Sequence, residues 1–374
     1  MINSLKDFLD KKGLYYDKID YTIIRDSWNI LNEHITLPYV IHIVGTNGKG
    51  STGRYLASLL MQLNQKVLHY SSPHILKFNE RIWIEGVDVS DETLQITHIQ
   101  LQSILPIHLL DKLTYFEYTT LLALYLSNDK DYLVLEAGLG GEFDATNVVK
   151  NNLSIITTIG LDHQNFLGDT IPLIAATKMR SCDTSFILSD QIYSEVIDVK
   201  NEILLNKKEI SKKTFILTSN AKKLPQYLQN NLETVLSVLD YLGFSDFNYT
   251  LPNLFGRYQW LNDNIIIDVG HNPLAAQAIA KELEVENRKF ILVYNSFEDK
   301  NYQEVLKILK PYISEVQIIK CNDTRIVKND ILEKTITDLS LTVNHFDTIN
   351  ENEENYYLVF GSFLVVENFL KGYE

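Results

Sequence analysis

The amino-acid sequence predicts an α/β protein with a mostly parallel sheet and a second, smaller α/β domain. Short apolar runs that end in glycine or a polar residue, typical of buried parallel strands, alternate with segments whose apolar residues recur at helical spacing. The chain has 374 residues and is 45% hydrophobic, which is ample for packed cores and favours more than one domain. Ligands of such sheets bind beyond the carboxyl ends of the strands, so the polar residues there are the candidates for function.

The first strand and helix enclose a glycine-rich stretch. The run Tyr39–Gly45 is apolar and ends in glycine, and Ser51–Leu63 has apolar residues at a helical period. Between them the chain reads "HIVGTNGKGST" from His42 to Thr52. This departs from the usual phosphate-loop pattern, because Gly50 directly follows Lys49 where a serine or threonine is expected.

The remaining elements of the first domain continue the alternation. We expect strands at Lys66–His74, Asp131–Gly138 and Leu153–Gly160, and helices at Thr114–Leu126 and Thr170–Met179. The last of these helices has Thr170 as its cap and Pro172 in its first turn. Besides Gly45, the informative residues at the strand ends are Ser71, Ser72, Glu136, Asp162 and His163.

The chain changes character at residues 180–225, which are rich in lysine and asparagine. A helix is expected at Tyr227–Gly243, followed by a turn-rich segment. We therefore place a domain boundary near Tyr249, with a first α/β domain at 1–249 and a second, smaller one at 250–374. The second domain contains the apolar runs "NIIIDVG", "FILVYN", "EVQIIK" and "NYYLVFG", each expected to form a strand.

Composition excludes several classes of function. The formal net charge of −14 argues against a general nucleic-acid binder. Cys182 and Cys321 lie far apart in no metal-ligand spacing, as expected of reduced cytosolic thiols. The N-terminal stretch "MINSLKDFLDKKG" is typical of an amphipathic helix and not of a signal peptide, and no apolar run reaches membrane-spanning length. We expect a cytoplasmic protein that binds neither membrane nor nucleic acid.

The glycine-rich stretch suits the binding of phosphate. Its backbone amides can surround phosphate oxygens, and the following helix adds a positive N-terminal dipole. Lys49 can neutralise a terminal phosphate, and the Ser51 hydroxyl can reach a phosphate or its Mg²⁺. The alternative is a plain turn between strand and helix, but a strand before, a helix after and a lysine with a hydroxyl favour phosphate. The predicted nucleotide contacts here are Thr46, Asn47, Gly48, Lys49, Gly50 and Ser51.

The chain resembles a known family. "GTNGKGS" is similar to the nucleotide loop of the Mur-ligase superfamily, in which this shortened spacing is the rule. Seven further blocks, in order, resemble the folylpolyglutamate synthase / dihydrofolate synthase family. They are "SSPHILKFNERI", "TYFEYTT", "EAGLGGEFDATN", "TTIGLDHQNFLGDTIPLIAATK", "FGRYQW", "IDVGHNP" and "FGSFLVVE". The resemblance implies a Mur-ligase-like fold with an N-terminal, ATP-binding phosphate-loop domain at 1–249. It also implies a smaller, Rossmann-like C-terminal domain of the Mur-ligase glutamate-ligase type at 250–374.

The resemblance also implies an ATP-dependent ligase. Such an enzyme joins L-glutamate to dihydropteroate, to reduced folates, or to both through an acyl phosphate, and it requires Mg²⁺ to hold several negative partners together. The family places two Mg²⁺ ions on residues that match Ser72, Glu136, His163 and Lys178, the last as a lysine carboxylated by CO₂. Without the resemblance, Ser72 fits a turn serine, His163 a loop histidine and Lys178 a surface lysine.

The remaining implied contacts divide between nucleotide and substrate. Asn231, with Asn230 as the alternative register, matches the residue near adenine, Asp268 the ribose contact, and Arg257 and His271 the phosphate contacts. The pteroate-contacting positions match Asp20, Thr114, Phe116 and Asp144, although Phe116 fits core packing equally well. The family's catalytic positions match Lys49, His163 and Lys178.

One departure and two alternatives accompany this interpretation. Glu142 stands where the family pattern has arginine, so we expect recognition of the anionic substrate to differ. The first alternative is another ligase of the superfamily, although a nucleotide loop that begins by residue 45 argues against the cell-wall type with its preceding UDP-binding domain. The second is a non-catalytic ATP-binding regulator, which would not need Glu136, His163 and Lys178 together. We expect a monomer.

Overall fold

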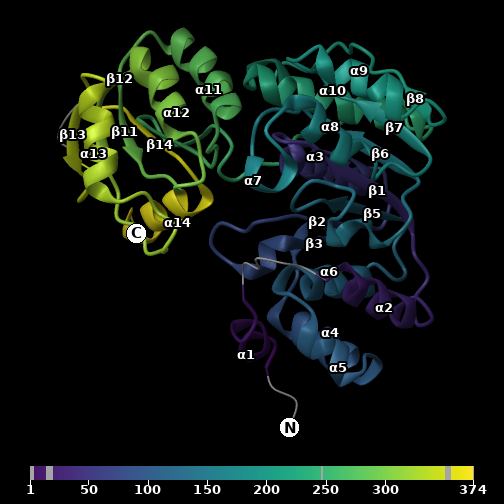
Figure 1. The fold of residues 1–374 in the computed structure, drawn as a ribbon. Helices are drawn as coiled ribbons and strands as arrows, with labels where there is room; N and C mark the ends of the chain where they lie inside the picture. The colour runs from purple at the N-terminus through teal and green to yellow at the C-terminus, as the bar shows by residue number, and fades with distance from the viewer. Residues whose placement is uncertain (1–3, 14–19, 246, 350–354, 374) are drawn as a thin grey trace. The chain divides into compact units, whose positions relative to one another are not determined.

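The computed structural model of the chain describes residues 4–13, 20–245, 247–349 and 355–373. The chain forms two compact units, and each is an α/β layer structure built on one sheet (Figure 1). Unit 1 comprises Met1–Ile159, Thr170–Ile216 and Asn230–Pro252. Unit 2 comprises Gly160–Asp169, Leu217–Gln229 and Asn253–Glu374.

The sheet of unit 1 has the strand order β4-β3-β2-β5-β1-β6-β7-β8. From β2 to β8 in this order the strands run parallel, whereas β3 and β4 are antiparallel to their neighbours. The sheet is therefore mostly parallel, as the sequence predicts. The strands are β1 (Tyr39–Val44), β2 (Val67–Tyr70), β3 (Ile82–Ile84), β4 (Val87–Asp88), β5 (Tyr132–Glu136), β6 (Leu153–Ile156), β7 (Ser185–Leu188) and β8 (Lys208–Ile210).

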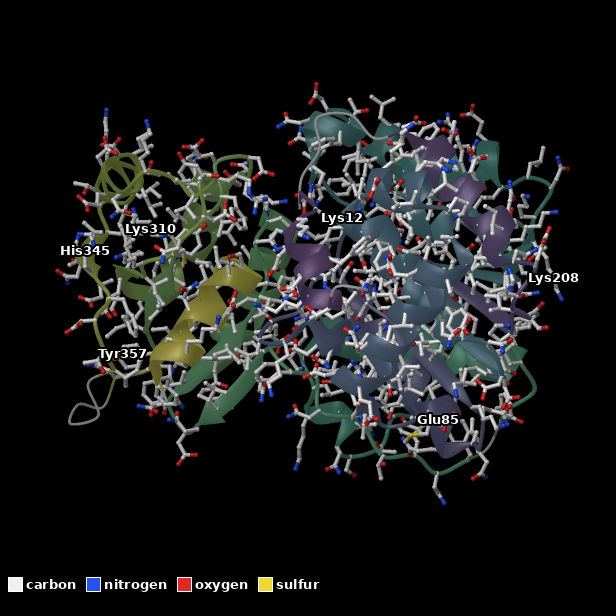
Figure 2. The ribbon with its side chains drawn as sticks, turned by 90° about the horizontal axis from the view of Figure 1, so that it is seen from below. Lys12, Glu85, Lys208, Lys310, His345 and Tyr357 are labelled. Carbon is white, nitrogen blue, oxygen red and sulfur yellow. The ribbon has the colours of Figure 1, made fainter. Side chains whose placement is uncertain are left out.

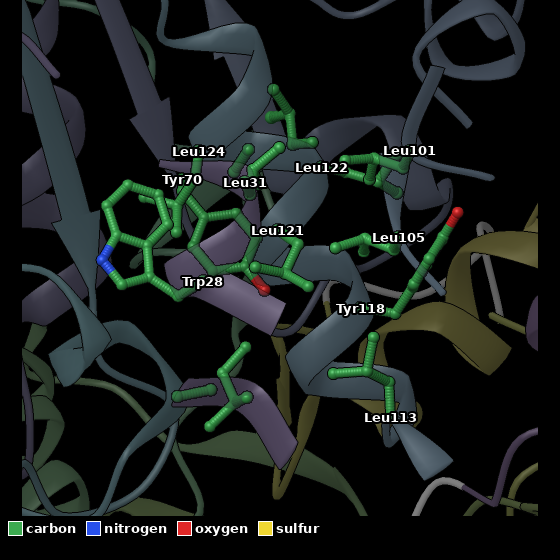
Figure 3. Packing of buried hydrophobic residues seen from close by; sticks show 14 of the residues in the cluster. Trp28, Leu31, Tyr70, Leu101, Leu105, Leu113, Tyr118, Leu121, Leu122 and Leu124 are labelled. Carbon is green, nitrogen blue, oxygen red and sulfur yellow. The ribbon is translucent and has the colours of Figure 1, made fainter. Parts of the chain in front are cut away.

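Helices cover this sheet and bury its side chains. They are α1 (Leu5–Asp10), α2 (Tyr21–Leu31), α3 (Lys49–Gln62), α4 (Asp91–Ile104), α5 (Ile107–Lys112), α6 (Tyr115–Leu126), α8 (Ile171–Met179), α9 (Glu195–Ile203) and α10 (Gln226–Tyr241), with the 3₁₀ turns η1 (Phe78–Arg81) and η2 (Ala145–Val148). Trp28 and Leu31 of α2 pack with Leu121 of α6 and Tyr70 of β2 in one hydrophobic core (Figure 3). Successive side chains of a strand point to opposite faces, so Val40 enters this core while Ile41 faces the other side.

Unit 2 has a smaller sheet in the order β13-β12-β11-β14-β10-β9, parallel except for β9. Its strands are β9 (Gln259–Asn262), β10 (Ile265–Asp268), β11 (Phe290–Tyr294), β12 (Ile313–Ile318), β13 (Thr342–His345) and β14 (Tyr357–Phe360). Its helices are α7 (Gln164–Leu167), α11 (Pro273–Glu286), α12 (Tyr302–Leu309), α13 (Asn329–Asp338) and α14 (Phe363–Tyr373), with the 3₁₀ turns η3 (Ala221–Lys223) and η4 (Lys310–Tyr312). The core packs α11, α12 and α13 on the sheet.

Several element bounds differ from the expectation. The second strand is shorter than Lys66–His74, because the chain leaves β2 at Tyr70 and enters a loop ordered by Glu80. The third helix begins two residues before Ser51, at Lys49, so the lysine belongs to its first turn. In residues 180–225 the structure contains β7, α9 and β8, which were not expected because their apolar runs are short and, in β8, begin with an exposed lysine.

The surface carries the charged side chains. Glu85, Lys208 and Lys310 are exposed and project outward (Figure 2), whereas Tyr357 of β14 is buried. In the part of the chain that the structure describes, no helix has both the length and the apolar character needed to cross a membrane.

Candidate active site

The glycine-rich stretch forms a tight loop between β1 and α3. Gly45 has φ of 149° and Gly48, which precedes the first residue of α3, has φ of 89°. A Cβ on Gly45 would lie 1.8 Å from Thr157 Oγ1, so only glycine fits at this position. The amides of Thr46 and Asn47 both donate to the carbonyl of Thr158, at 3.0 and 3.2 Å. The loop is thus held against the end of β6 and followed directly by a helix N-terminus.

Two lysines converge on this loop. Lys49 Nζ donates to the carbonyls of Gly45 and Thr46, at 3.1 and 3.2 Å. Lys178 Nζ, on α8, donates to the same Gly45 carbonyl at 2.9 Å, and Lys178 is only 4% exposed. Two ammonium groups at one carbonyl oxygen concentrate positive charge beside the loop, which suits an anionic ligand.

The hydroxyl of Ser51 links the loop to helix α10. Ser51 Oγ donates to the Gly48 carbonyl at 3.1 Å and accepts a hydrogen bond from Asn231 Nδ2 at 2.9 Å. Asn231 also lies against Gly48, where an added Cβ would be 3.0 Å from its Oδ1. The structure therefore brings the predicted adenine-side residue Asn231, and not Asn230, to the phosphate loop.

Glu136 and Ser72 meet at the carboxyl ends of two neighbouring strands. Glu136 is the last residue of β5 and is 4% exposed, and Ser72 lies just beyond β2. The Ser72 amide donates to Glu136 Oε2 at 3.3 Å. Glu80, which was not anticipated as important, orders the following loop by accepting from the amides of Ile75, Leu76 and Lys77 at 2.7–2.8 Å. Its signal in the sequence is a glutamate three residues after the start of a turn.

A metal ion bound at the carboxyl ends of β2 and β5 would need oxygen ligands from a bound nucleotide or substrate as well as from the protein. Within the described residues, no three His, Cys, Asp or Glu side chains gather in a way that could hold a metal ion. Glu136 and Ser72 nevertheless offer a buried carboxylate and a hydroxyl at one strand edge, the hard oxygen donors that Mg²⁺ prefers together with phosphate. The donor set of unit 1 fits a nucleotide-bound Mg²⁺ better than a site built from protein ligands alone.

Three candidate substrate residues lie at helix starts. Asp20 caps α2 by accepting from the amide and hydroxyl of Thr22, at 3.1 and 2.6 Å. Thr114 caps α6, where its hydroxyl accepts from the amide of Glu117 at 3.2 Å. The half-buried Phe116 lies against Gly138, where a Cβ would be 2.7 Å from the ring. Asp20 and Thr114 therefore each stabilise the start of a helix, in addition to any part they take in substrate binding.

Asp144, the fourth candidate, is held by several donors. Its Oδ2 accepts from the amide of Leu139 at 2.7 Å, and its Oδ1 accepts from the amide and hydroxyl of Thr146, at 2.9 and 2.5 Å. Burial raises the pKa of this carboxyl group, and the hydrogen bonds from Leu139 and Thr146 oppose that rise. The side chain is fixed at the start of η2 with its oxygens aligned.

Glu142 has a partner that the sequence did not suggest. Its carboxylate lies 3.1 Å from the guanidinium of Arg180, just beyond helix α8. Position 142 therefore carries an ion pair in this chain, and the cation of that pair comes from the residue that follows α8.

Unit 2 contains a second group of predicted residues around Asp268. This carboxylate, at the end of β10, accepts from the amides of Gly270 and Tyr258, at 2.7 and 2.8 Å, and from Tyr227 Oη at 3.2 Å. Burial raises the pKa of Asp268, and the positive charge of Arg257 opposes the rise. The Arg257 guanidinium lies 5.1 Å from the ring centre of Phe363.

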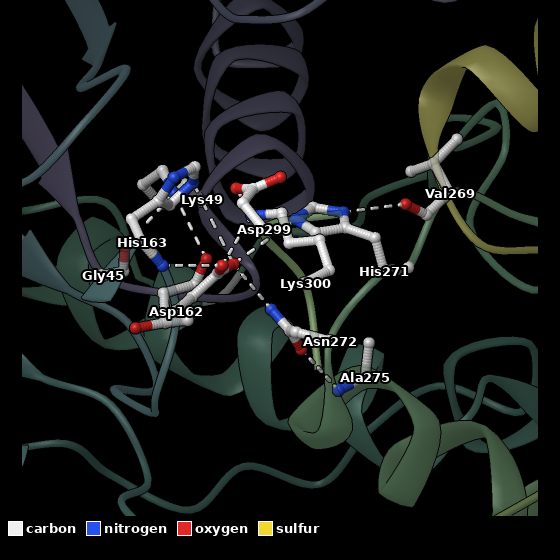
Figure 4. Close-up of polar contacts among 12 residues, drawn as sticks. Gly45, Lys49, Asp162, His163, Val269, His271, Asn272, Ala275, Asp299 and Lys300 are labelled. Carbon is white, nitrogen blue, oxygen red and sulfur yellow. Dashed lines mark hydrogen bonds and ion pairs between the residues drawn. The ribbon is translucent and has the colours of Figure 1, made fainter. Parts of the chain in front are cut away.

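Asp162, whose side chain is buried, is the centre of a polar cluster in unit 2 (Figure 4). Its Oδ1 lies 2.6 Å from Lys300 Nζ and accepts from the His163 amide at 2.8 Å. Its Oδ2 lies 3.3 Å from His271 Nε2 and accepts from Asn272 Nδ2 at 3.0 Å. Burial alone would raise the pKa of Asp162, but the bond and charge of His271, with His163 and Lys300, hold it well below its usual value.

This cluster fixes the backbone around His163. His163 has φ of 52°, a left-handed conformation that is uncommon for histidine, and it precedes α7. Lys300 was not anticipated from the sequence, because it lies 138 residues from Asp162 and a lone buried lysine has no local pattern. Within unit 2, therefore, His163 and His271 lie around one carboxylate.

The chain is similar to known proteins over most of its length. No protein-family model matches the chain. A "Dihydrofolate synthase/folylpolyglutamate synthase" of Haemophilus influenzae is 31% identical, over 89% of this chain and 88% of the relative. The crystal structure of Helicobacter pylori folylpolyglutamate synthetase is 38% identical with a TM-score of 0.79, over 98% of this chain and 97% of that one.

A further solved structure, Escherichia coli FolC in complex with DHPP and ADP, is 26% identical with a TM-score of 0.82, over 98% of this chain and 95% of that one. These similarities extend over nearly the full length of the chain in both solved structures. They confirm the fold class and the family resemblance noted in the sequence. The chain belongs to the dihydrofolate synthase/folylpolyglutamate synthase family.

Proposed function

We propose that this protein is an ATP-dependent ligase that joins L-glutamate to dihydropteroate, to reduced folates, or to both. The observation that carries the proposal is the phosphate loop of unit 1, where Lys49 Nζ donates to the Gly45 and Thr46 carbonyls at the N-terminus of α3. The Haemophilus influenzae relative bears the names of both synthase activities, and the Escherichia coli structure holds DHPP and ADP. A cytoplasmic monomer is part of the same proposal.

The proposed ligation has two steps and passes through an acyl phosphate. The substrate carboxylate attacks the γ-phosphorus of ATP and ADP departs, which leaves an acyl phosphate. The amine of glutamate then attacks the acyl carbon, phosphate departs and the nitrogen loses a proton. Lys49, Ser51 and the loop amides hold and orient the phosphates, and Asp268 accepts hydrogen bonds from the ribose, with Arg257 and His271 assigned to the phosphates.

A bound Mg²⁺ would neutralise the phosphate charge that builds up during transfer. Glu136 and Ser72 would hold one ion, and His163 and Lys178 a second. If Glu136 is a ligand, Glu136→Gln should raise the Mg²⁺ concentration required for half-maximal activity, because a charged ligand becomes neutral. An unchanged magnesium requirement in a folded variant would remove Glu136 from the site.

Lys178 serves as a metal ligand only after carboxylation of its amine by CO₂. Its burial supports this step, since an enclosed side chain can keep a modification that water would otherwise reverse. We expect Lys178→Ala to be inactive and to recover in part with acetate, and we expect a 44 Da adduct on Lys178 in native mass spectra, as follows from adding CO₂. Loss of activity without rescue or adduct would argue for an ordinary structural lysine.

The pterin end of the substrate is assigned to Asp20, Thr114, Phe116 and Asp144. A carboxylate can accept two hydrogen bonds from a flat aminopyrimidine, and an aromatic ring can stack on it. This assignment rests on the family positions, and it is supported by the exposure of Asp20 and the half-buried position of Phe116.

The decisive experiment measures phosphate release from ATP. We expect release when dihydropteroate and glutamate are supplied together, and almost none with either alone. The folded Lys49→Ala variant should have nearly lost it. A panel of reduced folates separates the two synthase activities and reveals how many glutamates are added. Nucleotide binding without turnover on any of these acids would instead favour a regulator, and turnover on another acid a different ligase.

A further inference from the structure

A buried chain of hydrogen bonds connects the strand that carries the phosphate loop with Asp144. His42 lies in β1, three residues before Gly45, and is 1% exposed. Its Nε2 lies 2.8 Å from Thr146 Oγ1 in η2, and Thr146 Oγ1 lies 2.5 Å from Asp144 Oδ1. These residues are 104 and 2 positions apart in the chain, so the fold and not local sequence brings them together.

The direction of each bond follows from the chemistry of the groups. A threonine hydroxyl has one hydrogen, and an ionised carboxylate can only accept, so Thr146 donates to Asp144. The hydroxyl oxygen must then accept from His42, which places the imidazole proton on Nε2. His42 Nδ1, which has no hydrogen-bond partner among the described residues, is left as an acceptor. Burial lowers the pKa of His42 to about 4, so the ring is neutral near neutral pH.

The register of the sheet explains why His42 faces this way. His42 pairs with Leu135 of β5, and Leu135 lies in the hydrophobic core that also receives η2 residues. Thr146 itself is 1% exposed, so no bulk water competes for either bond. Because Leu139 holds the other carboxylate oxygen, rotation of the Asp144 side chain is blocked at both oxygens.

We propose that His42 and Thr146 are positioning residues, which orient Asp144 to receive the aminopyrimidine edge of the pterin substrate. The inference rests on the proposed function, and it assigns roles to two buried residues that the proposed function leaves unassigned. β1, the strand that leads into the phosphate loop, thereby also helps to fix the orientation of the Asp144 carboxylate. Geometry of this kind matters because a carboxylate that can rotate loses part of its bidentate contact.

The test uses substitutions of nearly constant volume. Thr146→Val removes the hydroxyl, whereas Thr146→Ser keeps it, and His42→Phe removes the donor that His42→Gln retains. Thr97→Val is the matched control, because Thr97 is a buried threonine of α4 whose hydroxyl bonds within its own helix. Calorimetric titration gives the Kd of dihydropteroate in the presence of ADP and, separately, the Kd of ADP.

We expect Thr146→Val and His42→Phe to weaken dihydropteroate binding about tenfold, which corresponds to about 1.4 kcal/mol, with the Kd of ADP within about twofold of wild type. Thr146→Ser and Thr97→Val should bind both ligands as the wild type does. If His42→Phe does not fold, the Thr146 pair carries the test alone.

Two results would overturn the inference. In one, Thr146→Val binds dihydropteroate as tightly as the wild type. In the other, it loses affinity for dihydropteroate and ADP equally, together with a lower Tm, as a merely structural hydroxyl would. A wild-type protein that binds ADP but not dihydropteroate would contradict the proposed function itself, and so the two failures are distinguishable.

Discussion

Replacement of Gly45 by alanine should destabilise unit 1 by two separable effects. The φ of 149° is one that L-residues rarely adopt, which costs about 1–3 kcal/mol. The new Cβ would also lie 1.8 Å from Thr157 Oγ1, so Thr157 or the loop must move by on the order of 1.5 Å to reach ordinary contact. Overpacking of this kind costs about 1–3 kcal/mol more.

The sum, about 2–6 kcal/mol, should lower the Tm by on the order of 10 °C for a unit of this size. ADP binding should weaken as well, because the amides of Thr46 and Asn47 move with the loop. Thermal unfolding followed by circular dichroism and ADP titration measure the two effects.

A matched control separates strain from overlap. Gly243 also has a positive φ, 90°, but a Cβ there would have nothing within 4 Å, so Gly243→Ala should cost only about 1–2 kcal/mol. Thr157→Ala removes the overlapping hydroxyl, at the cost of its hydrogen bond to the Val44 carbonyl. The double variant Gly45→Ala/Thr157→Ala should therefore melt above Gly45→Ala. Equal losses for Gly45→Ala and Gly243→Ala, with no recovery in the double variant, would refute the reasoning.

Three further predictions concern buried and paired charges. First, the folded-state pKa of His42 is about 4 against about 6.5 when unfolded. The unfolded chain therefore takes up more protons between these values, and stability should fall by up to about 3 kcal/mol as pH drops from 6.5 to 4. Urea unfolding at several pH values should show this slope, and a folded His42→Gln variant should flatten it. Second, Lys300→Met leaves the buried Asp162 without its cation and should cost unit 2 about 3–5 kcal/mol in urea unfolding, whereas adding Asp162→Asn should recover part of the loss. If the single and double variants are equally unstable, the pair is not coupled. Third, Glu142→Arg places a like charge beside Arg180, and we expect a changed KM for glutamate or folate with little change for ATP. Arg180→Glu in the same chain should restore the pair, and identical kinetics in all variants would make the departure at position 142 neutral.

The sequence predicted those parts of the fold whose signals are local. Glycine marks the end of β1, and Thr170 with Pro172 marks the start of α8, where the Thr170 hydroxyl accepts from the Leu173 amide at 3.4 Å. The strands β7 and β8 escaped prediction because they are short, with four and three residues, and β8 begins with the exposed Lys208. Such strands are defined by the neighbours with which they pair, and that information is not local.

The same distinction applies to the site. Residues at strand ends, such as Glu136, could be selected from sequence because apolar neighbours make a carboxylate conspicuous. Lys300 could not, since its partner Asp162 is remote in the chain and a single lysine resembles any surface lysine. Thr146 and His42 also lay inside recognisable motifs, but they are 104 residues apart, so only the fold reveals that one bonds the other.

The placement of Asp162 has a consequence for protein synthesis on the ribosome. Asp162 belongs to unit 2 although the chain around it belongs to unit 1, and its partner Lys300 is made 138 residues later. At about 5–20 residues per second, Asp162 waits on the order of 10 s for its cation, and the last segment of unit 1, Asn230–Pro252, is also made during that interval. During that interval Gly160–Asp169 remains an unassembled loop of the nascent protein, open to chaperones and proteases. The C-terminal half of the chain, produced alone, would therefore not reproduce unit 2. It would contain Lys300 without the carboxylate of Asp162, which neutralises its charge.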